Sequence, residues 1–208
     1  MERVKLIEDY LEEIFPNPKC ELNYSKDYEL LISIMLSAQT TDKRVNEVTS
    51  ILYNKYPSLE NLKKADINDI KSILRPLGNF NKKAIYVKKI ASILVDKYNS
   101  VIPYKRKLLE ELPGVGRKTV NVFFSELNIE PNIAVDTHVE RVSKRLYLSK
   151  DTDDVIRIEK HLRRTFKKEN WNKRHLQLVL FGRYKCKAIS PMCDDCKLMC
   201  ICKKYKNK

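Results

Sequence analysis

The sequence has little of what several common architectures require. It contains only four glycines in 208 residues, too few for a glycine-rich all-β design. Its longest strongly apolar run, residues 28–38, includes serines and is far shorter than the roughly 20 residues that span a bilayer. The N-terminus is amphipathic and acidic, and it lacks the apolar core of a secretory signal. We therefore expect neither a transmembrane nor a secreted protein.

Charge is abundant, but it is unevenly distributed. The formal net charge is +14, and residues 141–208 carry 20 Lys and Arg against seven Asp and Glu. Hydrophobic residues make up 43% of the chain, so this is a folding sequence and not a disordered basic tail. A basic region of this size favours a polyanionic partner, of which nucleic acid is the commonest. The alternative is a generally basic proteome in which lysine serves solubility.

Hydrophobic periodicity predicts an all-α protein without a run of alternating strands. Apolar residues recur at helical spacing along most of the chain, and residues 28–36 are apolar on nearly every side, as in a buried central helix. Residues 133–135 are predicted to be extended, and Thr137 with Glu140 fits a capping box for the next helix. The expected helices cover residues 4–14, 28–36, 45–56, 67–74, 84–98, 108–112, 117–127, 137–146, 154–166 and 171–184.

Residues 112–119, LPGVGRKT, join two of these expected helices. They include two of the four glycines, Gly114 and Gly116, and glycine lets backbone amides approach a ligand closely. The start of the next helix adds free amides and a partial positive charge, and Arg117 with Lys118 adds two cations. These features suit a phosphate of a nucleic-acid backbone. For the glycines alone, a tight turn between helices with no ligand is an equally good explanation.

Five of the six cysteines lie between positions 186 and 202. Without a secretory signal we expect a reducing compartment, where disulfides are disfavoured and clustered thiols are metal ligands. Four of them follow the spacing Cys186-x6-Cys193-x2-Cys196-x5-Cys202. By chemistry alone, this set fits either zinc or an iron–sulfur cluster. Cys200 is a fifth thiol in the loop and could replace Cys202 as a ligand.

Together these motifs resemble the endonuclease III family of DNA repair glycosylases. LPGVGRKT is similar to the family's helix-hairpin-helix motif. Residues 134–142 (AVDTHVERV) are similar to its second signature, and the cysteine cluster is similar to its third. Residues 29–42 match as well, so the resemblance runs nearly end to end with the motifs in the family's order. It implies an all-α fold of two helical domains, a helix-hairpin-helix glycosylase fold with a C-terminal iron–sulfur cluster loop.

The resemblance assigns the chemistry to Lys118 and Asp136. Lys118 lies at a helix start, where the positive end of the helix and Arg117 both disfavour the ammonium form of its side chain. The neutral amine that results can form a Schiff base with a sugar. By resemblance it attacks C1′ of the damaged nucleotide, the base leaves, and the imine allows β-elimination. Asp136 stabilises the cationic sugar and orients or deprotonates Lys118. Its alternative role is a helix cap, a position that Thr137 already fits.

The cysteine spacing is similar to that of the family's four-iron four-sulfur (4Fe-4S) cluster. This similarity implies that Cys186, Cys193, Cys196 and Cys202 are the cluster ligands and that Cys200 is an additional residue. The implied role of the cluster is structural, because it holds a basic loop with Lys185 and Lys187 against DNA phosphates. Nothing in the sequence requires a redox role.

The resemblance also implies how a damaged base is reached. Enzymes that act on a base extrude it from the duplex, and Gln39 lies at the family position that fills the vacated space. The family often has a leucine wedge after the glycine that corresponds to Gly78, where this chain has Asn79. Either Phe80 or Leu77 is then the wedge, or the opposite strand is read by hydrogen bonds. The other expected DNA contacts are Gly114, Val115, Gly116, Arg117, His138 and Lys187.

We expect two domains in this chain. Residues 20–130 form a six-helix domain with the helix-hairpin-helix at about residues 105–127, and residues 1–19 with 131–208 form the cluster domain. Double-stranded DNA with a damaged base or abasic site is expected to bind between them, with Lys118 and Asp136 on opposite sides. The resemblance predicts a monomeric bifunctional DNA glycosylase and AP lyase for oxidised pyrimidines. We expect the protein to be cytoplasmic, and to be associated with the nucleoid if its source is a bacterium.

Two other functions stay open at this point. The first is an adenine or mismatch glycosylase of the same superfamily. Those relatives typically lack the lysine at the position of Lys118, and the adenine enzymes have a longer C-terminal domain. The second is a noncatalytic DNA-binding protein with a structural metal site of four cysteines, which predicts a colourless protein and no strand cleavage.

Overall fold

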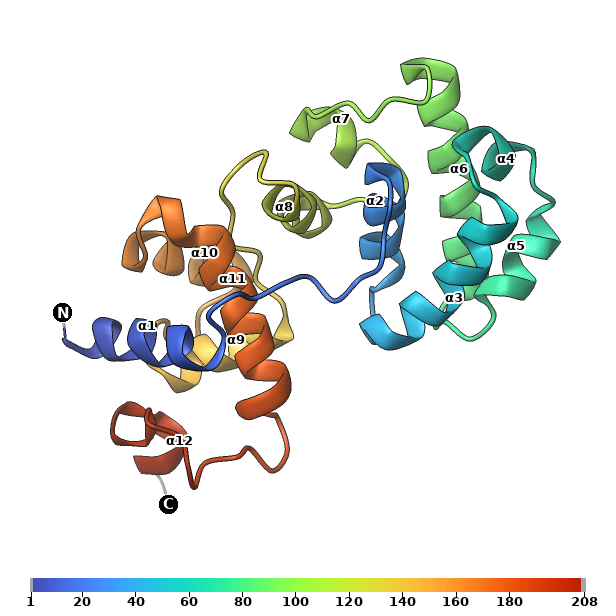
Figure 1. Cartoon of the computed structure of the whole chain (residues 1–208). Helices are drawn as coiled ribbons and strands as arrows, with labels where there is room; N and C mark the ends of the chain where they lie inside the picture. The colour runs from blue at the N-terminus through green and yellow to red at the C-terminus, as the bar shows by residue number, and fades with distance from the viewer. Residues whose placement is uncertain (1, 207–208) are drawn as a thin grey trace. The chain divides into compact units, whose positions relative to one another are not determined.

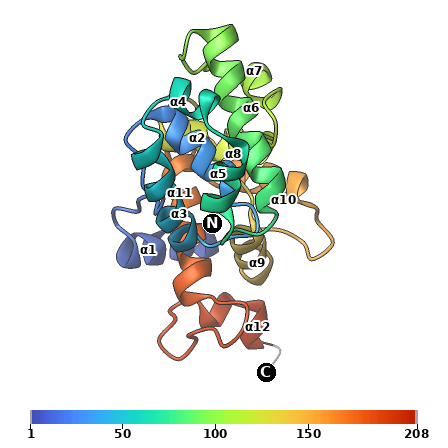
Figure 2. The same ribbon diagram turned by 90° about the vertical axis from the view of Figure 1, so that its right-hand side faces the viewer.

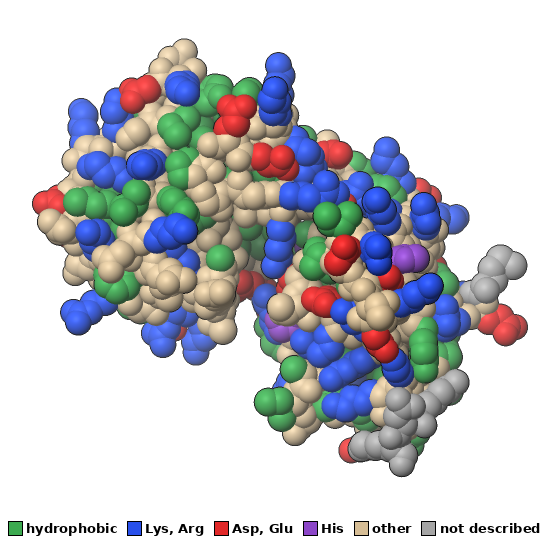
Figure 3. Space-filling model, turned by 180° about the vertical axis from the view of Figure 1, so that it is seen from behind, with side chains coloured by type: hydrophobic (Ala, Val, Ile, Leu, Met, Phe, Trp, Pro, Cys, Tyr) green, Lys and Arg blue, Asp and Glu red, His purple; other side chains and the backbone are tan. Residues whose placement is uncertain are grey.

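The regular elements of this protein are helices (Figure 1). The structure is a computed structural model that describes residues 2–206, and this part of the chain contains no β-strand, which confirms the predicted all-α class. None of its helices is long and apolar enough to cross a membrane. Lys and Arg side chains are spread over the face drawn in Figure 3, with fewer carboxylates among them.

The chain divides into two compact units, Glu21–Phe123 and the remainder. We call the first the hairpin unit. The second, which we call the cysteine unit, comprises the chain up to Cys20 and everything from Phe124 onward. The division falls inside helix α8 (Arg117–Glu126) and not in the loop at about residue 130. Phe123 packs within the hairpin unit, since its ring stacks on that of Tyr104.

In the hairpin unit, shorter helices surround a buried one. Every residue of α2 after Asp27 is buried, as its uniformly apolar sequence predicts. The long helix α6 packs against α2, α4 and α5 (Figures 1 and 2). Periodicity missed α4, whose six residues include only two apolar ones, Leu59 and Leu62. The elements are α2 (Asp27–Leu36), α3 (Asp42–Lys55), α4 (Leu59–Lys64), α5 (Ile67–Leu74), α6 (Phe80–Tyr98), α7 (Arg106–Glu110) and the first part of α8.

The cysteine unit has a hydrophobic core of its own. Apolar residues of α1, α9, α10 and α11 meet in it, together with Phe181 and Leu198. Residues 133–135, predicted to be extended, are irregular and buried in this unit. Its elements are α1 (Glu2–Ile14), α9 (Thr137–Arg145), α10 (Val155–Thr165), the short η1 (Lys168–Asn170), α11 (Trp171–Leu180), a π-helical turn η2 (Phe181–Lys185), η3 (Met199–Ile201) and α12 (Lys203–Lys206).

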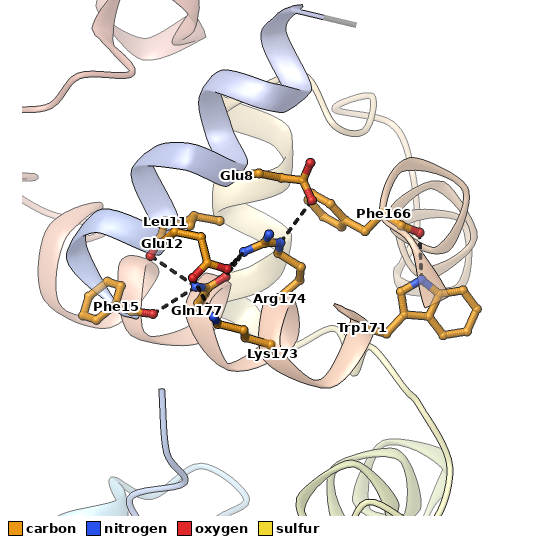
Figure 4. Close-up of polar contacts among 9 residues, drawn as sticks. All are labelled: Glu8, Leu11, Glu12, Phe15, Phe166, Trp171, Lys173, Arg174 and Gln177. Carbon is orange, nitrogen blue, oxygen red and sulfur yellow. Dashed lines mark hydrogen bonds and ion pairs between the residues drawn. The ribbon is translucent and has the colours of Figure 1, made fainter. Parts of the chain in front are cut away.

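Polar contacts hold the N-terminal helix against α11 (Figure 4). The nearly buried guanidinium of Arg174 donates to Glu8 at 3.2 Å and to Glu12 at 2.6 Å. The side-chain amide of Gln177 donates to the carbonyls of Leu11 and Phe15, which satisfies acceptors at the end of α1. Residues from the two ends of the chain thus form one unit.

Candidate active site

The hairpin between α7 and α8 requires glycine at position 114. Gly114 has a φ of +78°, and a Cβ added there would overlap the ring of Tyr86 and lie 3.2 Å from Met35. The Val115 amide donates to the carbonyl of Leu112 at 3.1 Å and closes the turn. Glycine therefore provides both the left-handed backbone and the space for the aromatic ring.

The predicted DNA contacts of the hairpin differ in what they can offer a phosphate. Val115 is 4% exposed and its amide is used inside the turn. Gly114, Gly116 and Arg117 are exposed. In the described part of the chain the Gly114 and Gly116 amides have no hydrogen-bond acceptor. These two amides therefore remain as backbone donors for an anion, in addition to the amides of the first turn of α8.

Lys118 is the second residue of α8 and directly follows this turn. Its side chain is exposed, so the amine is accessible from solvent. The helix start beside it presents backbone amides and a partial positive charge. The sequence predicted this placement at the start of a helix, and the structure confirms it.

Gln39 and Asn79 lie on two turns of the hairpin unit. Both are exposed, and both have left-handed backbone conformations, with φ of 57° and 56°. The side chain of Asn79 makes no capping hydrogen bond, although the residue is the N-cap of α6. Leu77 is only 2% exposed, so its proposed wedge role is wrong, because the side chain belongs to the core. Phe80 is half-buried at the start of α6.

Lys83 is a buried residue that the sequence analysis missed. It is 6% exposed, and its Nζ donates to the carbonyl of Ala38 at 2.8 Å and to Thr40 Oγ1 at 3.0 Å. Burial lowers the pKa of this ammonium group. Lys83 lies on the buried stripe of α6 with Val87 and Ile90. A lysine at helical spacing from such apolar residues was the available signal.

Asp136 is the N-cap of α9. Its Oδ1 accepts the backbone amides of His138 at 2.9 Å and Val139 at 2.8 Å. The assignment of this position to Thr137 is wrong, because Thr137 is already the first residue of the helix. Capping occupies only one of the two carboxylate oxygens, and Oδ2 has no hydrogen-bond partner among the described residues. Asp136 can therefore cap α9 and still present a charged oxygen.

His138 contacts Arg141, which lies one helical turn further along α9, and it packs against Gly182. Its Nδ1 is 3.2 Å from the guanidinium of Arg141, which also donates to the carbonyl of Gly182 at 2.7 Å. Gly182 lies in the π-helical turn, and a Cβ there would come 2.8 Å from the Cβ of His138. His138 is half-buried, so part of the residue remains accessible to solvent.

The predicted metal ligands gather around one pocket of the cysteine unit. The described residues contain no compact group of three or more His, Cys, Asp or Glu placed for a single metal ion. Four thiols around one pocket are a donor set that suits either zinc or an iron–sulfur cluster. The residues around it include Cys186, Cys193, Cys196, Cys202, Leu146, Phe181, Leu198 and Met199.

Arg145 connects α9 to this pocket. Its guanidinium donates to Cys186 Sγ at 3.2 Å and to the carbonyl of Lys187 at 2.7 Å. Burial raises the pKa of the Cys186 thiol, and the hydrogen bond from Arg145 opposes that effect. An N–H donor on sulfur is the kind of contact that stabilises a ligating thiolate. No local pattern in the sequence indicates this contact between distant segments.

Cys200 differs from the four pocket cysteines. It is exposed and is not among the pocket residues, whereas Cys202 is. Of Cys200 and Cys202, the geometry thus favours Cys202 as the metal ligand. Lys185 forms an ion pair with Asp195, which neutralises one of the two lysines expected to meet DNA. Lys187 is exposed.

Comparison with known proteins places the chain in a family. Residues 32–168 match the model of the HhH-GPD superfamily of base excision DNA repair proteins. This match covers more than half of the sequence. The chain therefore belongs to the HhH-GPD superfamily.

Its relatives within the superfamily include endonuclease III proteins. Endonuclease III of Bacillus subtilis (strain 168) is 40% identical over 203 residues, which are 98% of this chain and 93% of that protein. A trapped endonuclease III–DNA covalent intermediate has a TM-score of 0.91 at 43% identity, covering 96% of this chain and 93% of that one. A non-covalent endonuclease III–DNA complex has a TM-score of 0.95 at 41% identity, covering 99% and 96%.

The resemblance predicted from the motifs is thereby confirmed. Within the superfamily, the chain groups with endonuclease III, and it is a DNA glycosylase and AP lyase of base excision repair. Lys118 lies in the hairpin unit and Asp136 in the cysteine unit. The part that each residue takes in the reaction stays a prediction.

Proposed function

We propose that this enzyme removes oxidised pyrimidines from duplex DNA through a Schiff base on Lys118. The observation that carries the proposal is the exposed amine at the start of α8, directly after the glycine turn. A relative of 43% identity is described as a covalent intermediate with DNA, and such an adduct needs a nucleophile. A lysine amine next to phosphate-binding amides meets that need.

The reaction follows from the chemistry of this amine. The nitrogen of Lys118 attacks C1′ of the damaged nucleotide as the bond from C1′ to the base breaks, and the base takes up a proton as it leaves. Opening of the sugar ring then gives an imine between Lys118 and C1′. Loss of a proton from C2′ breaks the C3′–O3′ bond and releases the 3′ phosphate. Water finally hydrolyses the imine and frees the amine.

Asp136 is the carboxylate in this scheme. The sugar becomes cationic as the base leaves, and a carboxylate that is already held in position stabilises that charge without reorganisation. Capping fixes Asp136 through Oδ1 and leaves Oδ2 for the substrate or for a proton of Lys118. The structural and catalytic roles thus use different oxygens.

We assign a 4Fe-4S cluster to Cys186, Cys193, Cys196 and Cys202. The pocket that these cysteines line is otherwise mostly apolar, and Arg145 donates to one of the four sulfurs. Such a cluster supplies a rigid cross-link for a loop with little regular structure. We expect the loop to present Lys187 to DNA, and we expect the enzyme to work in the cytoplasm.

The contacts with DNA belong to the same proposal. Phosphates bind the amides of Gly114 and Gly116 and the side chain of Arg117. Gln39 fills the space of the extruded base, while Asn79 hydrogen-bonds the opposite strand and Phe80 wedges beside it. His138 contacts a phosphate near Asp136. Val115 contributes by shaping the turn.

Borohydride trapping on duplex DNA with one thymine glycol tests the proposed chemistry. We expect a covalent adduct with the wild type, none with Lys118→Ala, and an adduct with Lys107→Ala, which removes an exposed lysine from the other hairpin helix. Base release without an adduct would mean a monofunctional glycosylase. If neither thymine glycol nor abasic-site DNA reacted with the wild type, the proposed function would be wrong.

A further inference from the structure

The buried ammonium group of Lys83 has only neutral partners. Its Nζ donates to the Ala38 carbonyl and the Thr40 hydroxyl, and no carboxylate pairs with it in the described part of the chain. Burying a charge without a counter-ion is costly. A methionine could occupy similar space without this cost, so the directional hydrogen bonds of Lys83 need an explanation.

These hydrogen bonds are made on either side of Gln39. Ala38 and Thr40 are its chain neighbours, so one ammonium group holds both flanks of a residue whose φ is 57°. Left-handed conformations of residues other than glycine persist where surrounding contacts determine them. Lys83 supplies two such contacts, while the Gln39 side chain stays exposed.

Lys83 also contacts the second turn through its backbone. Its amide donates to the carbonyl of Asn79 at 3.1 Å, in the first turn of α6. Asn79 has a φ of 56°, and its exposed side chain makes no capping hydrogen bond. A single residue is thus bonded to the turns of both Gln39 and Asn79.

We propose that Lys83 is a positioning residue that fixes Gln39 relative to Asn79, so that both side chains enter the duplex together at the damaged base. This inference rests on the proposed function. Lys83 does not touch DNA itself, because its side chain is buried. It acts through the geometry of the two turns, where small displacements have large effects on rate.

A double-mutant cycle measures this role. Lys83→Met removes the hydrogen bonds, Gln39→Ala removes the inserted side chain, and the two are combined. The matched control is Lys88→Met, since Lys88 lies on the same helix and donates to the carbonyl of Ala65, away from both turns. Single-turnover base release from a thymine glycol duplex is compared with β-elimination on a preformed abasic site.

We expect Lys83→Met to slow base release about tenfold while β-elimination changes less than about twofold. Lys88→Met should change neither rate by more than about twofold. In the Gln39→Ala background, Lys83→Met should slow base release by less than about twofold, because the side chain that it positions is gone. A 2-aminopurine beside the lesion should show less unstacking with Lys83→Met than with the wild type.

Additive effects in the cycle would overturn the inference, as would equal losses in both reactions, which would indicate a general structural role. If Lys83→Met does not fold, Thr40→Val removes one of the two side-chain hydrogen bonds and keeps the lysine. It should slow base release about threefold, again without additivity to Gln39→Ala. Base release and borohydride trapping with the wild type test the proposed function separately. Failure of the proposed function is therefore distinguishable from failure of the positioning role of Lys83.

Discussion

Asp136 caps helix α9 by accepting the amide of Val139 at 2.8 Å on a single carboxylate oxygen. The same oxygen accepts the amide of His138, and the other oxygen has no hydrogen-bond partner among the described residues. The observed helix capping and the proposed charge stabilisation therefore fall on one side chain. They can be separated by substitution, because capping needs an acceptor oxygen and catalysis needs a negative charge.

Asp136→Asn should keep the cap and lose the charge. Asparagine caps as well as aspartate, so we expect the free energy of unfolding to change by less than about 0.5 kcal/mol, whereas Asp136→Ala should lose about 1 kcal/mol. Both variants should slow base release by about 100-fold or more. Urea unfolding and single-turnover kinetics measure the two effects. Normal base release by Asp136→Asn would show that the charge has no catalytic role.

Replacing Cys200 and Cys202 separately identifies the fourth metal ligand. Cys202 lines the pocket and Cys200 is exposed outside it. We expect Cys202→Ser to lose most of the bound iron and the brown colour, and Cys200→Ser to keep both. Iron content per chain and visible absorption are the measurements. The opposite result would move the ligand to Cys200, and zinc in place of iron would contradict the assigned cluster.

Gly114→Ala should destabilise the hairpin unit. The positive φ and the overlap with Tyr86 together predict a loss of more than about 1 kcal/mol in the free energy of unfolding. Gly78→Ala is the control, since nothing lies within 4 Å of its added Cβ, and it should stay within about 0.5 kcal/mol. DNA affinity at fixed salt should fall only for Gly114→Ala. Equal stabilities of the two variants would contradict this account of the turn.

The ion pairs of Glu12 should make stability depend on pH. Partial burial raises the pKa of Glu12, but hydrogen bonds from Lys173 and Arg174 outweigh burial, and the pKa lies below its ordinary value. The stabilisation is therefore complete above the unfolded-state pKa of about 4.3 and is lost as the pH falls through the folded-state value. The carboxylate side chain is 38% exposed, so screening limits the effect to about 1 kcal/mol.

Urea unfolding of Glu12→Gln and the wild type should differ at pH 7 and converge below about pH 4. Glu13→Gln is the matched control, because Glu13 forms an exposed pair with Lys197, and such pairs contribute little. A Glu12→Gln difference that does not change with pH would show that the ionised carboxylate contributes nothing to stability.

Local pattern accounted for most of the helices and for the position of Lys118 in the first turn of α8. Helices with several turns of apolar spacing were found, whereas α4, in which only Leu59 and Leu62 are apolar, was missed. The cap of α9 was assigned one residue late, because both Asp136 and Thr137 are good capping residues and only the hydrogen bonds to His138 and Val139 distinguish them. The sequence also did not reveal that Leu77 is buried, since an apolar residue after a proline can lie in the core or on the surface.

The sequence by itself determined the helical class, the family, the glycine turn and the cysteine set, because these depend on periodicity and on spacing between near neighbours. Only the tertiary structure decided that Lys83 donates to Ala38 and Thr40 on either side of Gln39, and that Arg145 donates to Cys186. These contacts join segments about 40 residues apart. Such contacts depend on how helices pack, which no local pattern specifies.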